Sequence, residues 1–131
     1  MRYMGIDYGT KKLGIALSNE DGTMAFPHGV IKNDKMLLST LESLISEKNV
    51  AEIVVGHSLN ADGSDNVVQE SIDEFIGELT LRAPLPVHLE PEQYSTQEAI
   101  RLQGRNTETD ASAATIILNS FLTKLKNTTQ I

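Results

Sequence analysis

The spacing of apolar residues changes along this chain, and the order of the change restricts the folds open to it. Residues 2–8 and 13–18 are short apolar runs separated by a glycine-containing turn, as in an antiparallel hairpin. A third run, 24–32, follows the turn-forming pair Asp21-Gly22. Its Pro27 has no N–H to donate to a ladder of strand hydrogen bonds. The start of the chain therefore predicts a three-stranded meander with the third strand at an edge.

A helical spacing of apolar residues replaces this pattern after Asp34. The Asp34 side chain is suited to cap the helix by accepting a hydrogen bond from its first turn. Residues 50–56 read as a buried strand, and apolar residues in 67–79 recur at helical spacing until Pro84 stops that helix. Residues 87–89 supply a short fifth strand. The first helix is expected to cover the sheet with Leu37, Leu38, Leu41, Leu44 and Ile45.

Two further helices complete the predicted order of elements. Ser95 and Glu98 match a capping box that opens a helix over residues 95–102, and a last helix covers about 110–124. Connections through helices make the fourth and fifth strands parallel to the first, whereas the hairpin makes the second antiparallel to it. The sequence thus predicts one α/β domain over residues 1–131, with a mixed five-stranded sheet flanked by helices. The last helix is expected to bury Ala114, Ile117, Leu118, Phe121 and Leu125.

The composition argues against several classes of protein. The chain has no Cys, which excludes a disulfide scaffold and a thiolate zinc site. It contains no uncharged apolar run of about 18 residues, and Asp7 interrupts the stretch in which a signal peptide would need unbroken apolar residues. We therefore expect a soluble, cytoplasmic protein that has no membrane partner. The formal net charge of −7 argues against a broadly basic nucleic-acid-binding surface.

Three carboxylates are distinguished by their places in the predicted topology. Asp7 ends the first strand, Glu92 follows the fifth, and Asp110 begins the last helix. Each alone has an ordinary explanation, as a turn acid, an exposed loop acid or an acid that favours the helix dipole. Together they can converge at one edge of the sheet, where mutual repulsion would call for a hard cation, Mg²⁺ or Mn²⁺. Such a site is suited to phosphodiester hydrolysis.

Four segments occur in an order that matches one known family: MGIDYGTKKLGIALS, VVGHSLNADGS, EQYSTQEA and DASAATIILNSFL. Through them nearly the whole chain resembles the YqgF/RuvX family of Holliday-junction-resolvase-like proteins. The resemblance implies a ribonuclease-H-like fold and a metal-dependent nuclease that matures the 5′ end of pre-16S rRNA in ribosome biogenesis. It also implies that Asp7, Glu92 and Asp110 are the catalytic residues and the metal ligands, which are the positions that the topology selects.

Two segments depart from the family pattern. Pro91 and Gln93 flank Glu92 where the family usually has Asp and Arg, so one acid and one cation are missing. Glu90 is a candidate substitute for the missing acid. His57 stands in the loop after the fourth strand where the family has an apolar residue. A lone loop histidine more often has no catalytic role, so we leave it out of the catalytic set.

Cations that could hold RNA are few. Lys11 and Lys12 occupy the first turn, close in sequence to the acidic site, and Arg101 and Arg105 are one helical turn apart. We expect these four side chains to contact the phosphate backbone. With so few contacts, binding should be weak and salt-dependent.

Other functions remain open at this point. The chain could be a catalytically silent RNA-binding or regulatory module on the same fold, or a Holliday-junction resolvase that acts on branched DNA. Residues 5–10 also resemble the first phosphate loop of actin-like and sugar-kinase-like ATPases. That reading ranks last, because those ATPases close two such domains over a nucleotide and 131 residues supply one.

Overall fold

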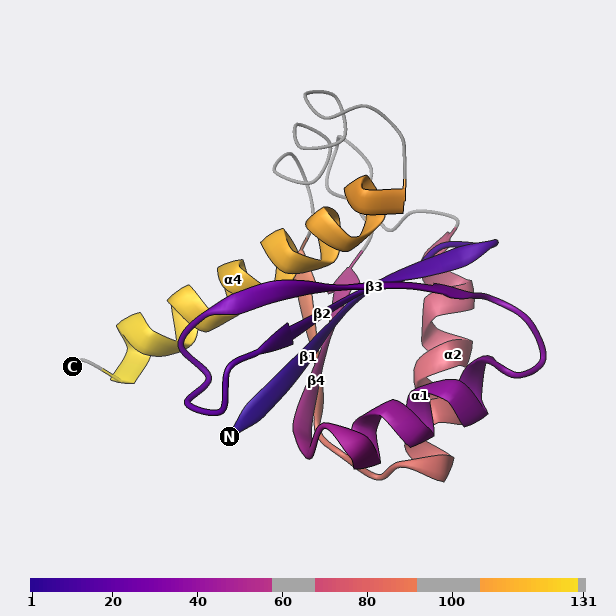
Figure 1. Cartoon of the computed structure of the whole chain (residues 1–131), viewed down its shortest axis with the longest axis horizontal. Coiled ribbons are helices and arrows are strands. Elements are labelled where there is room, and N and C mark those ends of the chain that lie inside the picture. The colour runs from indigo at the N-terminus through magenta and orange to yellow at the C-terminus, as the bar shows by residue number, and fades with distance from the viewer. Residues whose placement is uncertain (58–67, 92–106, 130–131) are drawn as a thin grey trace.

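A computed structural model describes residues 1–57, 68–91 and 107–129 of the chain. The helix predicted at 95–102 lies outside these residues. Three strands come first and helices separate the later strands, in the order that the sequence predicts (Figure 1). The elements are β1 (Arg2–Asp7), β2 (Lys12–Ser18), β3 (Ala25–Lys32), α1 (Leu37–Glu47), β4 (Val50–His57), α2 (Val68–Arg82), β5 (Val87–Pro91) and α4 (Thr107–Thr129).

The five strands form one mixed sheet in the order β3-β2-β1-β4-β5. β2 is antiparallel to β1 and to β3, whereas β4 is parallel to both β1 and β5. The predicted meander and the two parallel crossovers are therefore confirmed, and β3 lies at an edge. The pairing of β2 with β3 shifts register next to Pro27, the residue without an N–H for the ladder.

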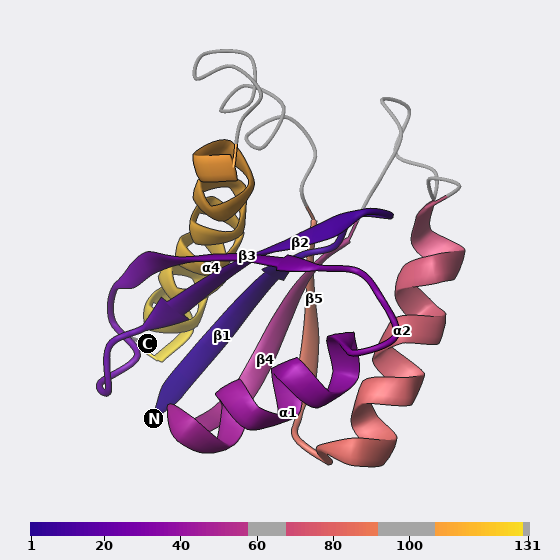
Figure 2. The ribbon, with the colours of Figure 1, turned by 45° about the vertical axis from the view of Figure 1, so that its right-hand side comes forward.

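Helices cover both faces of this sheet, with α1 and α2 on one face and α4 across the other (Figure 2). Side chains alternate along β1, so that Met4 and Ile6 pack with α1 and α2 whereas Tyr3 packs with α4. The predicted apolar stripe of α1 is confirmed, with Leu41 fully buried at its centre. The smaller core under α4 consists of Tyr3, Ala16, Ala25, Val54, Ala114, Ile117, Leu118 and Leu122.

Glycines make both early turns possible. At Gly9 a Cβ atom would stand 2.5 Å from the carbonyl oxygen of Lys12, closer than real side chains come. Gly22 has a φ of +70°, a conformation that favours glycine, and its N–H donates to the carbonyl of Asn19 at 3.1 Å. The turns predicted at these two glycines are therefore confirmed.

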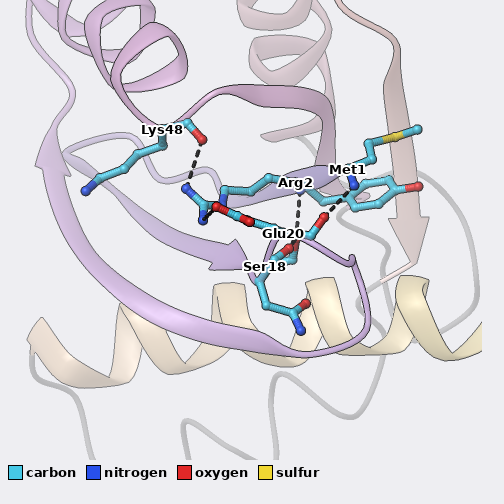
Figure 3. Close-up of polar contacts among 7 residues, drawn as sticks. Met1, Arg2, Ser18, Glu20 and Lys48 are labelled. Atoms are coloured by element: carbon cyan, nitrogen blue, oxygen red, sulfur yellow. Dashed lines mark hydrogen bonds and ion pairs between the residues drawn. The ribbon is translucent and has the colours of Figure 1, made fainter.

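Polar contacts hold the amino end of β1 to three other segments (Figure 3). The guanidinium of Arg2 donates to the carbonyl of Lys48 at 2.9 Å and lies 3.8 Å from the exposed carboxylate of Glu20. The buried N–H of Tyr3 donates to Oγ of Ser18 at 2.8 Å. These directional bonds fix where β1 begins, and the strand pairings then fix where it ends.

The start of α1 differs from its prediction. Asp34 accepts a hydrogen bond from the N–H of Met36 at 2.9 Å, but the helix begins at Leu37 and Met36 occupies the cap position. Asp34 therefore shapes the turn before the helix and does not cap it. The prediction of an Asp34 cap was wrong because an Asp side chain bonds a nearby turn N–H as readily as a helical one.

The last helix is longer at both ends than predicted. Its buried stripe includes Leu122, which is 4% exposed, whereas Leu125 is 37% exposed. Burial of Leu125 was predicted wrongly, because the carboxyl-terminal part of α4 extends past the sheet (Figure 1). Among the helices of the described residues, none is long and apolar enough to cross a membrane.

Candidate functional site

Asp7 is the last residue of β1, the central strand. Because side chains alternate along the strand and Tyr3 packs toward α4, Asp7 also stands on the α4 face. It is partly buried and lies opposite Gly14 of β2. The sequence therefore places a carboxylate where the central strand ends, beneath the helix that covers this face.

The helix α4 runs back against β1 at close range. At Gly5 a Cβ atom would stand 3.0 Å from the carbonyl oxygen of Ala114, so that any side chain there would push α4 from the sheet. Two residues earlier in β1, the ring of Tyr3 lies 5.8 Å from the ring of Phe121, which comes later in α4. The two elements are therefore antiparallel, and the amino end of α4 lies at the carboxyl end of β1.

The backbone of Asp110 is at this same end. Asp110 precedes Ala114 by about one turn of α4. In β1, Asp7 follows Gly5 by two residues. From the contact at Gly5, both Asp110 and Asp7 therefore lie toward the edge where β4 and β5 also end (Figure 2). The predicted site residues Asp7 and Asp110 thus belong to one end and one face of the sheet. Asp110 is described by its backbone alone.

The carboxyl ends of the parallel strands are level with one another. Ile6 of β1 pairs with Val55 of β4, and His57 at the end of β4 pairs with Pro91 at the end of β5. Glu92 is the residue after Pro91 and lies outside the described residues. Its predicted role in the site stays a prediction, although the strand that precedes it ends at the expected edge.

Lys11, in the turn between β1 and β2, and Lys12, the first residue of β2, are both exposed to solvent. Asn33 holds this turn from the end of β3, since its side-chain amide donates to the carbonyl of Gly9 at 2.8 Å and its N–H donates to the carbonyl of Lys11 at 2.9 Å. The backbone of the turn is thus fixed while both lysine side chains are exposed. The other predicted contacts with nucleic acid, Arg101 and Arg105, lie outside the described residues.

Glu90 is almost completely buried under α4, and its partners were not predicted. Its carboxylate accepts a hydrogen bond from the hydroxyl of Ser120 at 2.8 Å and forms an ion pair with the ammonium of Lys124 at 2.6 Å. These bonds tie the edge strand β5 to α4. The carboxylate is therefore engaged in holding the helix, which argues against Glu90 as the substitute for the missing acid of the family pattern.

A second polar group under α4 joins three strands and was not predicted. The imidazole of His88 lies 2.6 Å from the carboxylate of Glu52, and its ring packs on Phe121 with centroids 4.8 Å apart. Burial raises the pKa of the Tyr3 hydroxyl above 10.0, and the neighbouring charge and hydrogen bond of Glu52 raise that pKa further. The sequence analysis missed this group, because its members are far apart in the sequence and no periodic pattern connects them.

Within the described ranges, no three His, Asp or Glu side chains are gathered as ligands for a metal ion. Of the three predicted ligands, Asp7 alone has a described side chain. The predicted metal centre at Asp7, Glu92 and Asp110 therefore stays a prediction, while the fold brings the backbone positions of Asp7 and Asp110 to one end of the sheet.

Two of the solved structures that share this fold are resolvases. The chain is similar to RuvC of Thermus thermophilus in complex with a Holliday junction substrate, with a TM-score of 0.63 and 14% identity over 96% of each chain. It is also similar to the Fowlpox virus resolvase, with a TM-score of 0.61 and 12% identity over 95% of this chain and 99% of that one. The strand order and these likenesses define a ribonuclease-H-like fold.

Sequence comparison is more specific. Residues 1–124 match the family described as "RuvX: Holliday junction resolvase". A relative from Oleidesulfovibrio alaskensis named "Putative pre-16S rRNA nuclease" is 36% identical over 93% of this chain and 92% of its own length. One of the same name from Nitratidesulfovibrio vulgaris is 38% identical over 93% of each chain. The chain belongs to the RuvX family.

Proposed function

We propose that this chain is a metal-dependent nuclease that hydrolyses phosphodiester bonds in the precursor of 16S rRNA. The observation that carries the proposal is the common position of Asp7 and Asp110, at the end of the sheet where the strand before Glu92 also ends. The names of relatives that are 36% and 38% identical to the chain support precursor rRNA as the substrate.

Asp7, Glu92 and Asp110 are the residues that hold Mg²⁺ or Mn²⁺ in this proposal. Carboxylate oxygens are hard ligands, and these ions bind through one or two carboxylates together with water and substrate phosphate. When bound, the ions supply an activated water and stabilise charge on the phosphate. Partial burial of Asp7 at the end of a central strand holds this carboxylate in place, which is what a ligand to a geometrically demanding ion needs.

Lys11 and Lys12 hold the phosphate backbone of the RNA beside this site, together with Arg101 and Arg105. Their exposed position on a turn that Asn33 fixes supports this role for the two lysines. The net charge of −7 leaves little other attraction for a polyanion, so binding depends on few contacts and falls steeply with salt.

Cleavage of branched DNA is the second candidate. The description of the family as resolvases and the junction-bound RuvC structure favour it, although RuvC shares only 14% identity with this chain. A silent RNA-binding module is the third candidate, because Pro91 and Gln93 stand where the family usually has Asp and Arg.

Cleavage of a precursor 16S rRNA fragment and of a four-way DNA junction, each with Mg²⁺ or Mn²⁺, tests the proposal. Asp7→Asn should lower the rate on the RNA by more than about 100-fold, beyond the loss typical of groups that only support a metal ligand. Its melting temperature should not fall. The matched control is Asp21→Asn, which removes the same charge from an exposed turn and should leave the rate unchanged.

The outcomes separate the three candidates. Equal rates for the wild type and Asp7→Asn would remove Asp7 from the catalytic site. Faster cleavage of the DNA junction than of the RNA would favour the resolvase. Binding of the RNA without cleavage under either cation would establish the silent module.

A further inference from the structure

A cavity of about 240 Å³ lies at the same end of the sheet as Asp7 but on the opposite face. It is bounded by Tyr8, by the segment between β3 and α1, and by one side of α2. Its volume is below that of a typical site for a drug-sized ligand and suits a single flat ring system. Nothing in the proposed metal chemistry uses this cavity.

The wall nearest the sheet is aromatic and apolar. Tyr8 packs against Phe75 of α2, with ring centroids 5.2 Å apart and planes tilted by 43°. Leu37 and Leu38 line the cavity beside them. Tyr8 is only partly buried, so its ring offers an aromatic surface next to the residue that ends β1. Unstacked bases of single-stranded nucleic acid bind on such side chains.

The rim of the cavity is acidic. Asp34, Glu74 and Glu78 line it and are exposed, and Lys35 is the one cation among the described residues that line it. Three carboxylates repel a phosphate, so the group that enters is not the charged part of a nucleotide. An ionised carboxylate accepts hydrogen bonds only, and it therefore selects a ligand whose edge carries N–H donors.

Guanine is the base that meets this requirement best. Its Watson–Crick edge carries two adjacent N–H donors, which match the two oxygens of one carboxylate. Uracil offers one N–H between two carbonyl acceptors, and these acceptors would face the carboxylates. Adenine and cytosine offer an amino group and fall between guanine and uracil.

The cavity is joined to the turn that carries the lysines. Asn33 lines the cavity and also donates hydrogen bonds to the carbonyls of Gly9 and Lys11. Consecutive residues Asp7 and Tyr8 point to opposite faces of the sheet, because side chains alternate along a strand. A nucleotide with its base on Tyr8 would then have its phosphate near the end of the sheet, where the exposed lysines and Asp7 lie.

We propose that this cavity, lined by Tyr8, Phe75, Glu74 and Glu78, is a subsite for one unstacked guanine of a single-stranded RNA substrate. The inference rests on the proposed nuclease function and deepens it, since it names the base that the enzyme reads next to the bond it cuts. The basic turn holds phosphate and the acidic cavity selects the base.

Binding of short oligoribonucleotides that differ only in one central base tests the subsite. Binding is measured by fluorescence anisotropy in the absence of divalent cations. Omission of the cations prevents metal-dependent cleavage, so the result does not depend on the nuclease proposal. The wild type should bind the guanine oligonucleotide about tenfold more tightly than the uracil one. The double variant Glu74→Gln and Glu78→Gln should bring this ratio close to one. Loss of negative charge strengthens RNA binding in general, but that effect cancels in the ratio.

Glu70→Gln is the matched control, because Glu70 is exposed on the same helix one turn before Glu74 and does not line the cavity. It should keep the tenfold ratio. A wild-type ratio near one, or a ratio that survives in the double variant, would overturn the subsite. Displacement of the RNA by micromolar GMP would also overturn it, since the cavity would then be a site for free nucleotide.

Discussion

The two faces of the sheet bury different kinds of side chain. The face under α1 and α2 has a core of apolar residues, among them the fully buried Ile6, Leu41 and Ile53. The face under α4 has a smaller core and holds both polar residues that are buried in the described part of the chain, Ser18 and Glu90. The candidate carboxylate Asp7 also stands on the α4 face, so one sheet combines an apolar side and a polar side.

The apolar face mainly stabilises the fold, whereas the polar face positions the groups of the candidate site. Apolar burial is non-directional and supplies most of the free energy of folding, so the α1/α2 face can tolerate small shifts. A buried polar group needs a partner at a defined distance. Ser18 accepts the N–H of Tyr3, and Glu90 binds Ser120 and Lys124, so α4 and β1 are held at fixed positions. A metal site built from β1 and α4 requires that precision.

The largest effect on stability is expected from the apolar face. Leu41→Ala removes a fully buried side chain and should lower the free energy of unfolding by about 3 kcal/mol, the usual cost of such a cavity. Denaturant unfolding measures this loss. The cleavage rate of the folded protein should stay close to that of the wild type, because Leu41 lies on the face away from Asp7 and does not line the cavity beside Tyr8. A full loss of cleavage with unchanged stability would contradict the division between the faces.

A smaller effect is expected from the ion pair under α4. Glu90→Gln keeps the shape of the side chain and an acceptor for Ser120, and Lys124 is 62% exposed and can return to water. The free energy of unfolding should therefore fall by only about 1 kcal/mol. Lys124→Met is the partner variant, and a double-mutant cycle gives the coupling between the two residues.

The cleavage rate of Glu90→Gln tests whether Glu90 also belongs to the acidic site. If Glu90 only ties α4 to β5, this variant should retain most of the wild-type rate under conditions where it is folded. A loss as large as that of Asp7→Asn would instead make Glu90 a member of the acidic site, in the place of the acid that the family pattern has at Pro91.

The order of the elements along the chain, the directions of the strands and the end at which Asp7 lies could be predicted from the sequence. These follow from local signals, namely the spacing of apolar residues, the turn glycines and the need of parallel strands for crossovers. The close contact between α4 and Gly5 could not be predicted, because a glycine inside a strand does not indicate which element packs against it.

The polar groups under α4 escaped prediction for a related reason. The partners Glu90 and Lys124 are 34 residues apart, and His88 and Glu52 are 36 residues apart. No periodic pattern connects such residues. Leu125 shows the opposite failure: it fits the helical period and is exposed, because the period does not say where the sheet ends.

In the proposed nuclease, Asp7, Glu92 and Asp110 converge on one metal ion site. Anomalous X-ray diffraction from crystals grown with Mn²⁺ tests it most directly, because the signal locates the ion and the map shows its ligands. We expect a Mn²⁺ ion with carboxylate oxygens of all three residues at about 2.1–2.3 Å. A Mn²⁺ ion bound elsewhere, with these carboxylates pointing apart, would contradict it.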